Sequence, residues 1–272
     1  MKKRTLSVWI FLTTLLGAAA LTGLRYYQLS RCMDGAGLLI RGSRVAWGTI
    51  GIGVLLIAAL VCLIVRLDKR PGTEDSLHSG IGWHLLSAVT AAALMAGFGL
   101  YSLRTELTDT VHLVLYTAGV FAGALLIISD ALRIWGKRSH FLLLLIPTLF
   151  FAARLIFDFK VWSTDPAVID FCFRLLASVT GMLACFHLAA FPIGIGKKRT
   201  TVFFCMLAFA FSAVTVSDYL CRECAVRELT VYAALGLWCL INGMMLLFGK
   251  TEESAAVDGA PEECPQTEQE EE

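Results

Sequence analysis

Charged residues are scarce in this sequence. Asp, Glu, Lys and Arg make up 17% of its 272 residues, whereas a soluble globular domain has about a quarter. Hydrophobic residues make up 57%, and the mean hydropathy is +0.71. The chain is therefore too apolar to be a soluble globular domain. Its formal net charge of +1 gives no basis for binding nucleic acid.

Motifs of common enzyme classes are absent as well. The sequence has no His-Glu-x-x-His zinc motif, no Gly-x-Ser-x-Gly nucleophile elbow and no glycine-rich phosphate loop. Its five histidines are scattered singly, which favours interfacial hydrogen bonding over metal ligation. The links between apolar runs are too short for a soluble catalytic domain. We expect a non-enzymatic protein without a cofactor or a metal.

Long apolar runs are what the sequence does have. A helix that spans a bilayer needs about 20 mostly apolar residues, and such runs recur along the whole chain. We expect eight spans, at residues 6–27, 45–66, 82–103, 110–132, 140–158, 167–191, 201–220 and 229–248. This pattern predicts an all-α fold, a polytopic integral membrane helical bundle over residues 1–250, located in the cell (plasma) membrane.

Basic clusters indicate the orientation of this bundle. Lys and Arg gather in cytoplasmic loops, and the links after the second, fourth and sixth runs carry Asp68-Lys69-Arg70, Gly136-Lys137-Arg138 and Gly196-Lys197-Lys198-Arg199. We therefore expect both termini inside the cell. The one discordant feature is the first outer segment, which holds Arg25, Arg31, Arg41 and Arg44.

The two ends of the chain have their own signals. The first run, led by Lys2-Lys3-Arg4 and containing Ala18-Ala19-Ala20, is also typical of a cleaved signal peptide, which would leave seven spans and an outside N-terminus. Residues 251–272 carry nine acidic residues and no basic ones. Such a segment is too polar to fold alone, so we expect a disordered acidic cytoplasmic tail.

Four charged residues flank the link between the fifth and sixth spans, and the order of their charges is mirrored across it. Arg154 precedes Asp158 by four residues, and Asp170 precedes Arg174 by four. Asp165-Pro166 is a favourable helix start, because Asp caps free N–H groups and Pro fits the first turn. The fifth and sixth spans should then form an antiparallel hairpin that gathers all four charges near its outer end. The link 160–166, Lys-Val-Trp-Ser-Thr-Asp-Pro, resembles a stretch of uncharacterised bacterial membrane proteins and implies no activity.

The two arginines of this hairpin differ in their access to water. Side chains lean toward the N-terminus of their helix, so Arg174 leans outward to water and Arg154 leans deeper. We expect Arg174 to pair with Asp170 in a structural role, and the Arg154–Asp158 pair to need contacts on other helices. The cluster has two interpretations, structural glue for the hairpin or a site for a polar solute or ion. Asp218, near the outer end of the seventh span, is a candidate member.

Other polar groups suggest helix contacts. Asp130 and Arg133 flank the inner end of the fourth span and are expected to reach the interface. Asn242 lies deep in the eighth span, where its default role is a hydrogen bond to a neighbouring helix. Glycines on the sixth and eighth spans favour close helix approach: Gly181, Gly236 and Gly243.

Two function classes follow, together with a less favoured third. The first is a small-solute transporter or transport-accessory protein with a charged outer vestibule. The second is a non-catalytic membrane sensor or scaffold, whose basic loops and acidic tail contact a membrane or cytosolic protein partner. The third is an extracytoplasmic thiol-disulfide oxidoreductase that uses Cys221 and Cys224, a Cys-x-x-Cys pair in the last outer loop.

Overall fold

Eight long helices make up nearly all of the computed structural model. It describes residues 3–32, 44–67, 71–72, 77, 80–102, 110–162, 172–221 and 226–249. The helices are α1 (Lys3–Arg31), α2 (Arg44–Ile64), α3 (Ile81–Ser102), α4 (Thr110–Ile134), α5 (Leu142–Trp162), α6 (Cys172–Ala189), α7 (Lys198–Cys221) and α8 (Val226–Phe248). All eight are long and apolar enough to cross a membrane. The predicted all-α fold with eight apolar helices is thereby confirmed.

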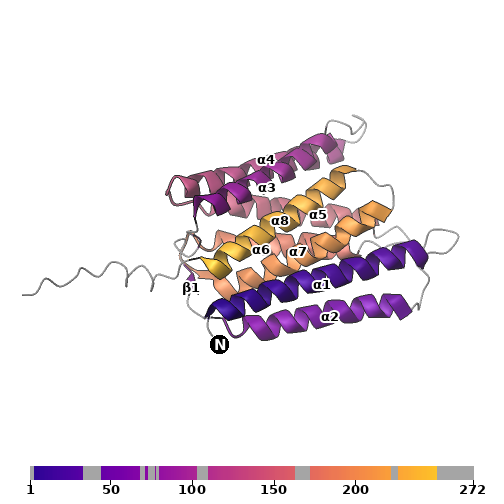
Figure 1. The fold of residues 1–272 in the computed structure, drawn as a ribbon. Coiled ribbons are helices and arrows are strands. Elements are labelled where there is room, and N and C mark those ends of the chain that lie inside the picture. The colour runs from indigo at the N-terminus through magenta and orange to yellow at the C-terminus, as the bar shows by residue number, and fades with distance from the viewer. Residues whose placement is uncertain are drawn as a thin grey trace, which may run out of the picture.

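Successive helices run in opposite directions, so the bundle has two ends (Figure 1). We call the end where α1 begins proximal and the other end distal. At the proximal end the Ser7 hydroxyl donates to the carbonyl of Leu247 at 3.1 Å, which ties the start of α1 to the end of α8. The loops after α2 and α6 meet there as β1 (Pro71–Gly72) and β2 (Gly196–Lys197), an antiparallel pair. The described start and finish of the chain therefore share one end.

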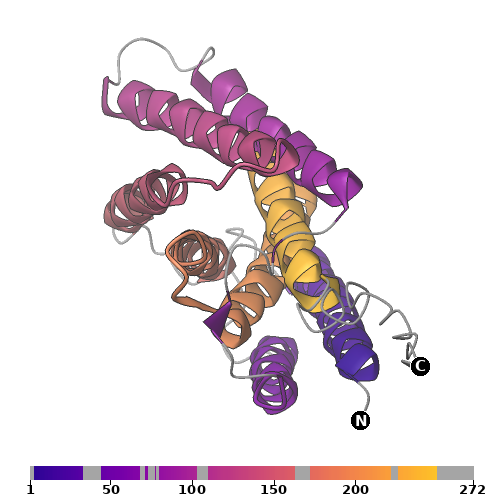
Figure 2. The ribbon, with the colours of Figure 1, turned by 90° about the vertical axis from the view of Figure 1, so that its left-hand side faces the viewer.

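Helix α8 occupies the middle of the bundle, between the α3–α4 hairpin and the helices α1 and α7 (Figure 2). In its apolar stretch 72% of the residues are buried, against 22% in α2, which lies at the edge. A Cβ atom on Gly236 would lie 2.8 Å from the Cβ of Ser212 in α7, and one on Gly181 of α6 would lie 3.0 Å from Leu235. The predicted close approach of helices at these glycines is confirmed.

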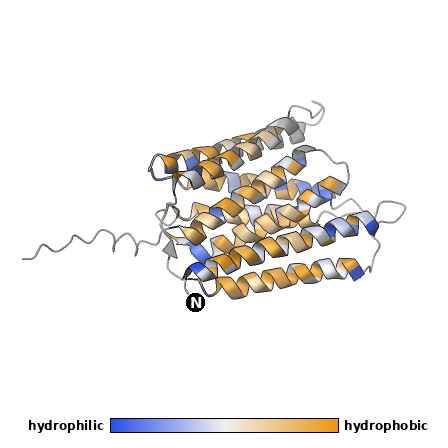
Figure 3. Ribbon diagram, in the orientation of Figure 1, coloured by the Kyte–Doolittle hydropathy of each residue, from blue (hydrophilic) through white to orange (hydrophobic). Residues whose placement is uncertain are grey.

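Aromatic and apolar side chains cover the outside of the bundle. Trp9, Trp47, Trp83 and Trp135 are exposed near helix ends, the positions that tryptophan favours at membrane interfaces. Hydropathy colouring shows polar residues concentrated toward the helix ends, with orange dominating between them (Figure 3). This pattern fits a surface that faces lipid along its middle.

Helix boundaries differ from the expected spans in one consequential place. The first span was expected to end at residue 27, but α1 continues to Arg31. Arg25, which was counted among the charges of the first outer segment, is a buried helical residue, 2% exposed. The expected start of the sixth helix near Asp165 and Pro166 lies outside the described residues, and so does the tail from Thr251.

Candidate functional site

The distal half of the bundle holds a cluster of polar side chains from several helices. Three helices each contribute two residues four positions apart, and this spacing places both on one helix face. They are Arg154 and Asp158 on α5, Arg174 and Ser178 on α6, and Glu228 and Tyr232 on α8. Together with Tyr219 of α7 we call these seven residues the distal cluster.

Arg154 is the most enclosed charge of the distal cluster, with 5% of the residue exposed. Its Nε lies 3.4 Å from a carboxylate oxygen of Asp158. Its guanidinium also lies over two rings, 5.1 Å from the centre of Phe98 on α3 and 5.5 Å from that of Tyr232. An arginine over an aromatic face gains electrostatic stabilisation when it is desolvated. These are cross-helix contacts of the kind that the sequence predicts for Arg154.

Arg174 is held by a second carboxylate, from α8. Its Nη2 donates to Oε2 of Glu228, and the hydroxyl of Tyr219 donates to the same oxygen. The Arg174 guanidinium lies 4.8 Å from the centre of the Tyr219 ring. Tyr219 stacks on Tyr232 with ring centres 6.1 Å apart, so the two ion pairs share one aromatic wall.

Two expectations about these charges need correction. Arg174 was expected to extend to water, but its side chain is only 13% exposed and binds Glu228. Asp218 was considered as a member of this cluster, but it accepts from Nε of Arg25 in α1 at 2.7 Å. The reason in both cases is a partner on a distant helix. Asp170, the expected partner of Arg174, lies outside the described residues.

Sequence reasoning missed Glu228, Tyr219 and Tyr232. Glu228 stands one residue before the expected eighth span and was counted as part of a loop, although it lies in the first turn of α8. The available signal was its spacing from Tyr232, because a polar pair four residues apart marks one face of a helix. No comparable signal marks Tyr219, since its role depends on the rotation of α7.

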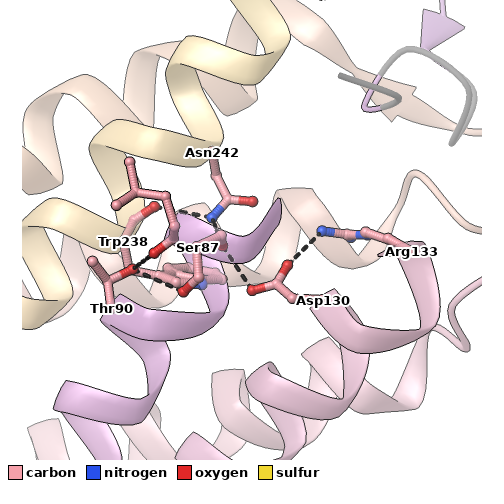
Figure 4. Close-up of polar contacts among 7 residues, drawn as sticks. Ser87, Thr90, Asp130, Arg133, Trp238 and Asn242 are labelled. Atoms are coloured by element: carbon pink, nitrogen blue, oxygen red, sulfur yellow. Dashed lines mark hydrogen bonds and ion pairs between the residues drawn. The ribbon is translucent and has the colours of Figure 1, made fainter. Parts of the chain in front are cut away.

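A second polar cluster lies toward the proximal end, between α3, α4 and α8 (Figure 4). The Ser87 hydroxyl donates to Oδ2 of Asp130 at 2.7 Å and accepts from Nδ2 of Asn242 at 3.1 Å. Nη1 of Arg133 lies 3.4 Å from the other oxygen of Asp130. The indole N–H of Trp238 faces Asp130 without a hydrogen bond of normal geometry. We call these five residues the proximal cluster.

The proximal cluster confirms one expectation and overturns another. Asn242 does bond a neighbouring helix, as expected. Asp130 and Arg133 were expected to reach the interface, but only 1% of each side chain is exposed. The α3–α4 hairpin packs against α8 over this turn and encloses both charges. A hydropathy pattern does not reveal which face of a helix end another helix covers.

The thiols of the expected redox pair fall outside the described part of the chain. Cys224 and the side chain of Cys221 lie outside the described residues. Cys185, Cys205 and Cys239 are fully buried in the bundle, where cysteine packs as a small apolar residue. Among the described residues no group of three His, Cys, Asp or Glu side chains is placed to hold a metal ion.

Comparisons with known proteins identify no relative of this chain. No protein-family model matches the chain, and no curated protein or solved structure resembles it significantly. The functional argument therefore depends on the two clusters and the helices that hold them.

Proposed function

We propose that the chain is a multi-pass protein of the cell membrane that binds a small polar solute at the distal cluster and carries it across the bilayer. The observation that carries this proposal is the distal cluster itself. Four charged side chains from α5, α6 and α8 lie close together inside a largely apolar bundle. Ionisable groups within membrane helices are costly to bury, and they commonly mark solute or ion pathways.

The arrangement of α8 supports a pathway rather than an isolated ion pair. Glu228 and Tyr232 lie in its distal half, and Trp238 and Asn242 belong to the proximal cluster. Leu235 and Cys239, both buried, separate the two clusters with apolar side chains. Helix α8 therefore contributes to both polar clusters, with a layer of apolar side chains between them.

The proximal cluster supplies a reason for the pathway to be closed at that end. Ser87 of α3 joins the α3–α4 hairpin to α8 through its hydrogen bond with Asn242, and its bond to Asp130 links the two helices of the hairpin. Movement of the hairpin away from α8 would break the bond between Ser87 and Asn242 and open the proximal end. Transporters alternate access by moving one group of helices against another around a fixed site. The α3–α4 hairpin is the moving group in this proposal.

The orientation belongs to the same proposal. Both termini face the cytosol, because the proximal loops carry the basic clusters. Arg25 no longer weighs against this orientation, since it is a buried ion-pair partner within α1. The distal cluster then faces the cell exterior, and the protein takes up its solute from that side.

Solute uptake by reconstituted protein tests the proposal. Wild-type proteoliposomes are compared with protein-free liposomes for uptake of amino acids, small carboxylates, amines, sugars and inorganic ions. The expected result is accelerated uptake of at least one solute, and its loss in the double variant Arg154→Met with Asp158→Met. Binding without uptake would favour a sensor or scaffold. The absence of both binding and uptake would exclude a solute site.

A further inference from the structure

Part of the Arg154 guanidinium has no hydrogen-bond partner among the described residues. Its contact with Asp158 is made through Nε, and no described group accepts a hydrogen bond from Nη1 or Nη2. The guanidinium carbon lies over the rings of Phe98 and Tyr232, so the aromatic contacts use no N–H group as a hydrogen-bond donor. The edge that carries Nη1 and Nη2 is therefore the part that remains for a further acceptor. Such an edge matches a carboxylate, which accepts two parallel N–H bonds.

Asp158 leaves acceptor capacity beside that edge. Arg154 is the one described partner of Asp158 within salt-bridge distance, through the contact to Oδ2, and the Arg174 guanidinium acts on Asp158 from farther away. Glu228 differs, because it already accepts from both Arg174 and Tyr219. A carboxylate has about four acceptor positions, so Asp158 retains room for a cationic donor. The free donors and the free acceptor are thus one helical turn apart on α5.

The charge balance of the distal cluster selects between kinds of solute. Its described members carry two guanidinium groups and two carboxylates, so their formal charges cancel. A single anion or a single cation bound there would leave an uncompensated charge in a poorly solvated place, which is costly. A solute that carries one charge of each sign keeps the site neutral.

We propose that the distal cluster binds a small zwitterion of the amino-acid type, with its carboxylate on Nη1 and Nη2 of Arg154 and its ammonium on Asp158. This inference rests on the proposed solute site and names its substrate class. The aromatic contacts with Phe98 and Tyr232 stabilise the guanidinium, and two of its N–H groups can bind a planar carboxylate in parallel.

Matched analogues of leucine test this inference on the wild-type protein. Leucine is compared with 4-methylpentanoate, which lacks the ammonium group, and with 3-methylbutylamine, which lacks the carboxylate. Glycine and phenylalanine extend the test to smaller and larger side chains. The readout is thermal stabilisation of detergent-purified protein, followed by equilibrium binding. We expect at least one amino acid to bind at least tenfold more tightly than its singly charged analogues.

Two variants connect this binding to the proposed residues. Arg154→Met with Asp158→Met removes both contacts without leaving a single charge, and it is expected to weaken amino-acid binding at least tenfold. Arg25→Met with Asp218→Met removes another buried pair of the distal half and is expected to leave binding within twofold. Equal loss in both variants would overturn the assignment to Arg154 and Asp158.

The outcomes separate this inference from the proposed function. A sugar, a simple anion or a simple cation could bind in an Arg154-dependent way while amino acids do not bind. That result would support the proposed solute site and reject its assignment to a zwitterion. If no solute of any class binds the wild-type protein, both proposals fail together.

Discussion

Arg25 of α1 and Asp218 of α7 form a buried ion pair that joins two helices 193 residues apart in sequence. Nε lies 2.7 Å from Oδ1, and the two side chains are 3% and 10% exposed. The Arg25 guanidinium also lies 5.5 Å from the centre of the Phe173 ring on α6. One arginine thus contacts two helices in the distal half of the bundle.

This pair gives the first prediction. Arg25→Ala should lower the stability of the protein in detergent by about 3–5 kcal/mol, because it leaves the buried Asp218 carboxylate without its cation. The matched control is Arg4→Ala, an exposed arginine of the same helix, which should change stability by about 0–1 kcal/mol. Thermal unfolding measures both. Equal small effects would mean that the Arg25 pair is solvated.

The distal cluster gives a second prediction, in which the structure changes what the sequence implied. From the sequence, Arg174→Ala is expected to be much milder than Arg154→Ala, because Arg174 reaches water. In the structure Arg174 binds Glu228 and is largely enclosed. We therefore expect both substitutions to destabilise strongly, by about 3–5 kcal/mol each. An Arg174→Ala protein as stable as wild type would support the water-exposed arrangement.

Removing both partners separates an ion pair from an isolated charge. Arg154→Ala combined with Asp158→Ala should recover much of the stability lost in Arg154→Ala, since no buried charge remains unpaired. The same logic applies to Arg174→Ala with Glu228→Ala. A double variant less stable than either single variant would mean that packing, rather than charge, dominates these positions.

The proximal cluster predicts a ranked pair of effects. Asn242→Leu removes the hydrogen bond to Ser87 and should cost about 0.6–2 kcal/mol, the range for hydrogen bonds between membrane helices. Asp130→Leu should cost more, because it leaves Arg133 buried beside an apolar side chain. Thermal unfolding in one detergent ranks the two. A larger loss of stability for Asn242→Leu than for Asp130→Leu would contradict the expectation that the buried carboxylate matters more than the single hydrogen bond.

Glycine packing gives a further prediction. Gly236→Ala should destabilise the bundle, because the added Cβ would lie 2.8 Å from the Cβ of Ser212 and the helices α7 and α8 must separate. Gly51 of α2 is the control, because it is exposed and no atom lies within 4 Å of an added Cβ. Gly51→Ala should be neutral or mildly stabilising, since alanine favours helix by about 1 kcal/mol over glycine. Equal effects on the melting temperature would argue against close contact of α7 and α8.

Thiol labelling in intact cells tests the orientation. Arg31→Cys at the distal end should react with a membrane-impermeant reagent, and Arg138→Cys at the proximal end should not. Both positions are exposed in the structure, so burial does not confuse the result. The background keeps the buried Cys185, Cys205 and Cys239 and replaces the other cysteines by serine: Cys32, Cys62, Cys172, Cys221, Cys224 and Cys264. Reaction at Arg138→Cys alone would reverse the proposed topology.

The sequence by itself determined the helices and some of their local properties. The lengths of the apolar runs determined the eight helices. The direction in which Arg154 leans predicted that it contacts other helices. The isolation of Asn242 within an apolar run predicted its bond to a neighbouring helix. These properties depend on one helix at a time, so a linear pattern is enough to determine them.

Only the tertiary structure decided which charges meet. Glu228 stands 54 residues from Arg174, and Asp218 stands 193 residues from Arg25. Such pairings depend on the rotation of each helix about its axis and on which helices are neighbours. Both are set by the packing of the whole bundle, in which glycines such as Gly236 let α7 and α8 approach closely. Asp130 and Arg133 are buried for the same reason, because the packing of the α3–α4 hairpin against α8 encloses a helix end that hydropathy alone leaves at the membrane surface.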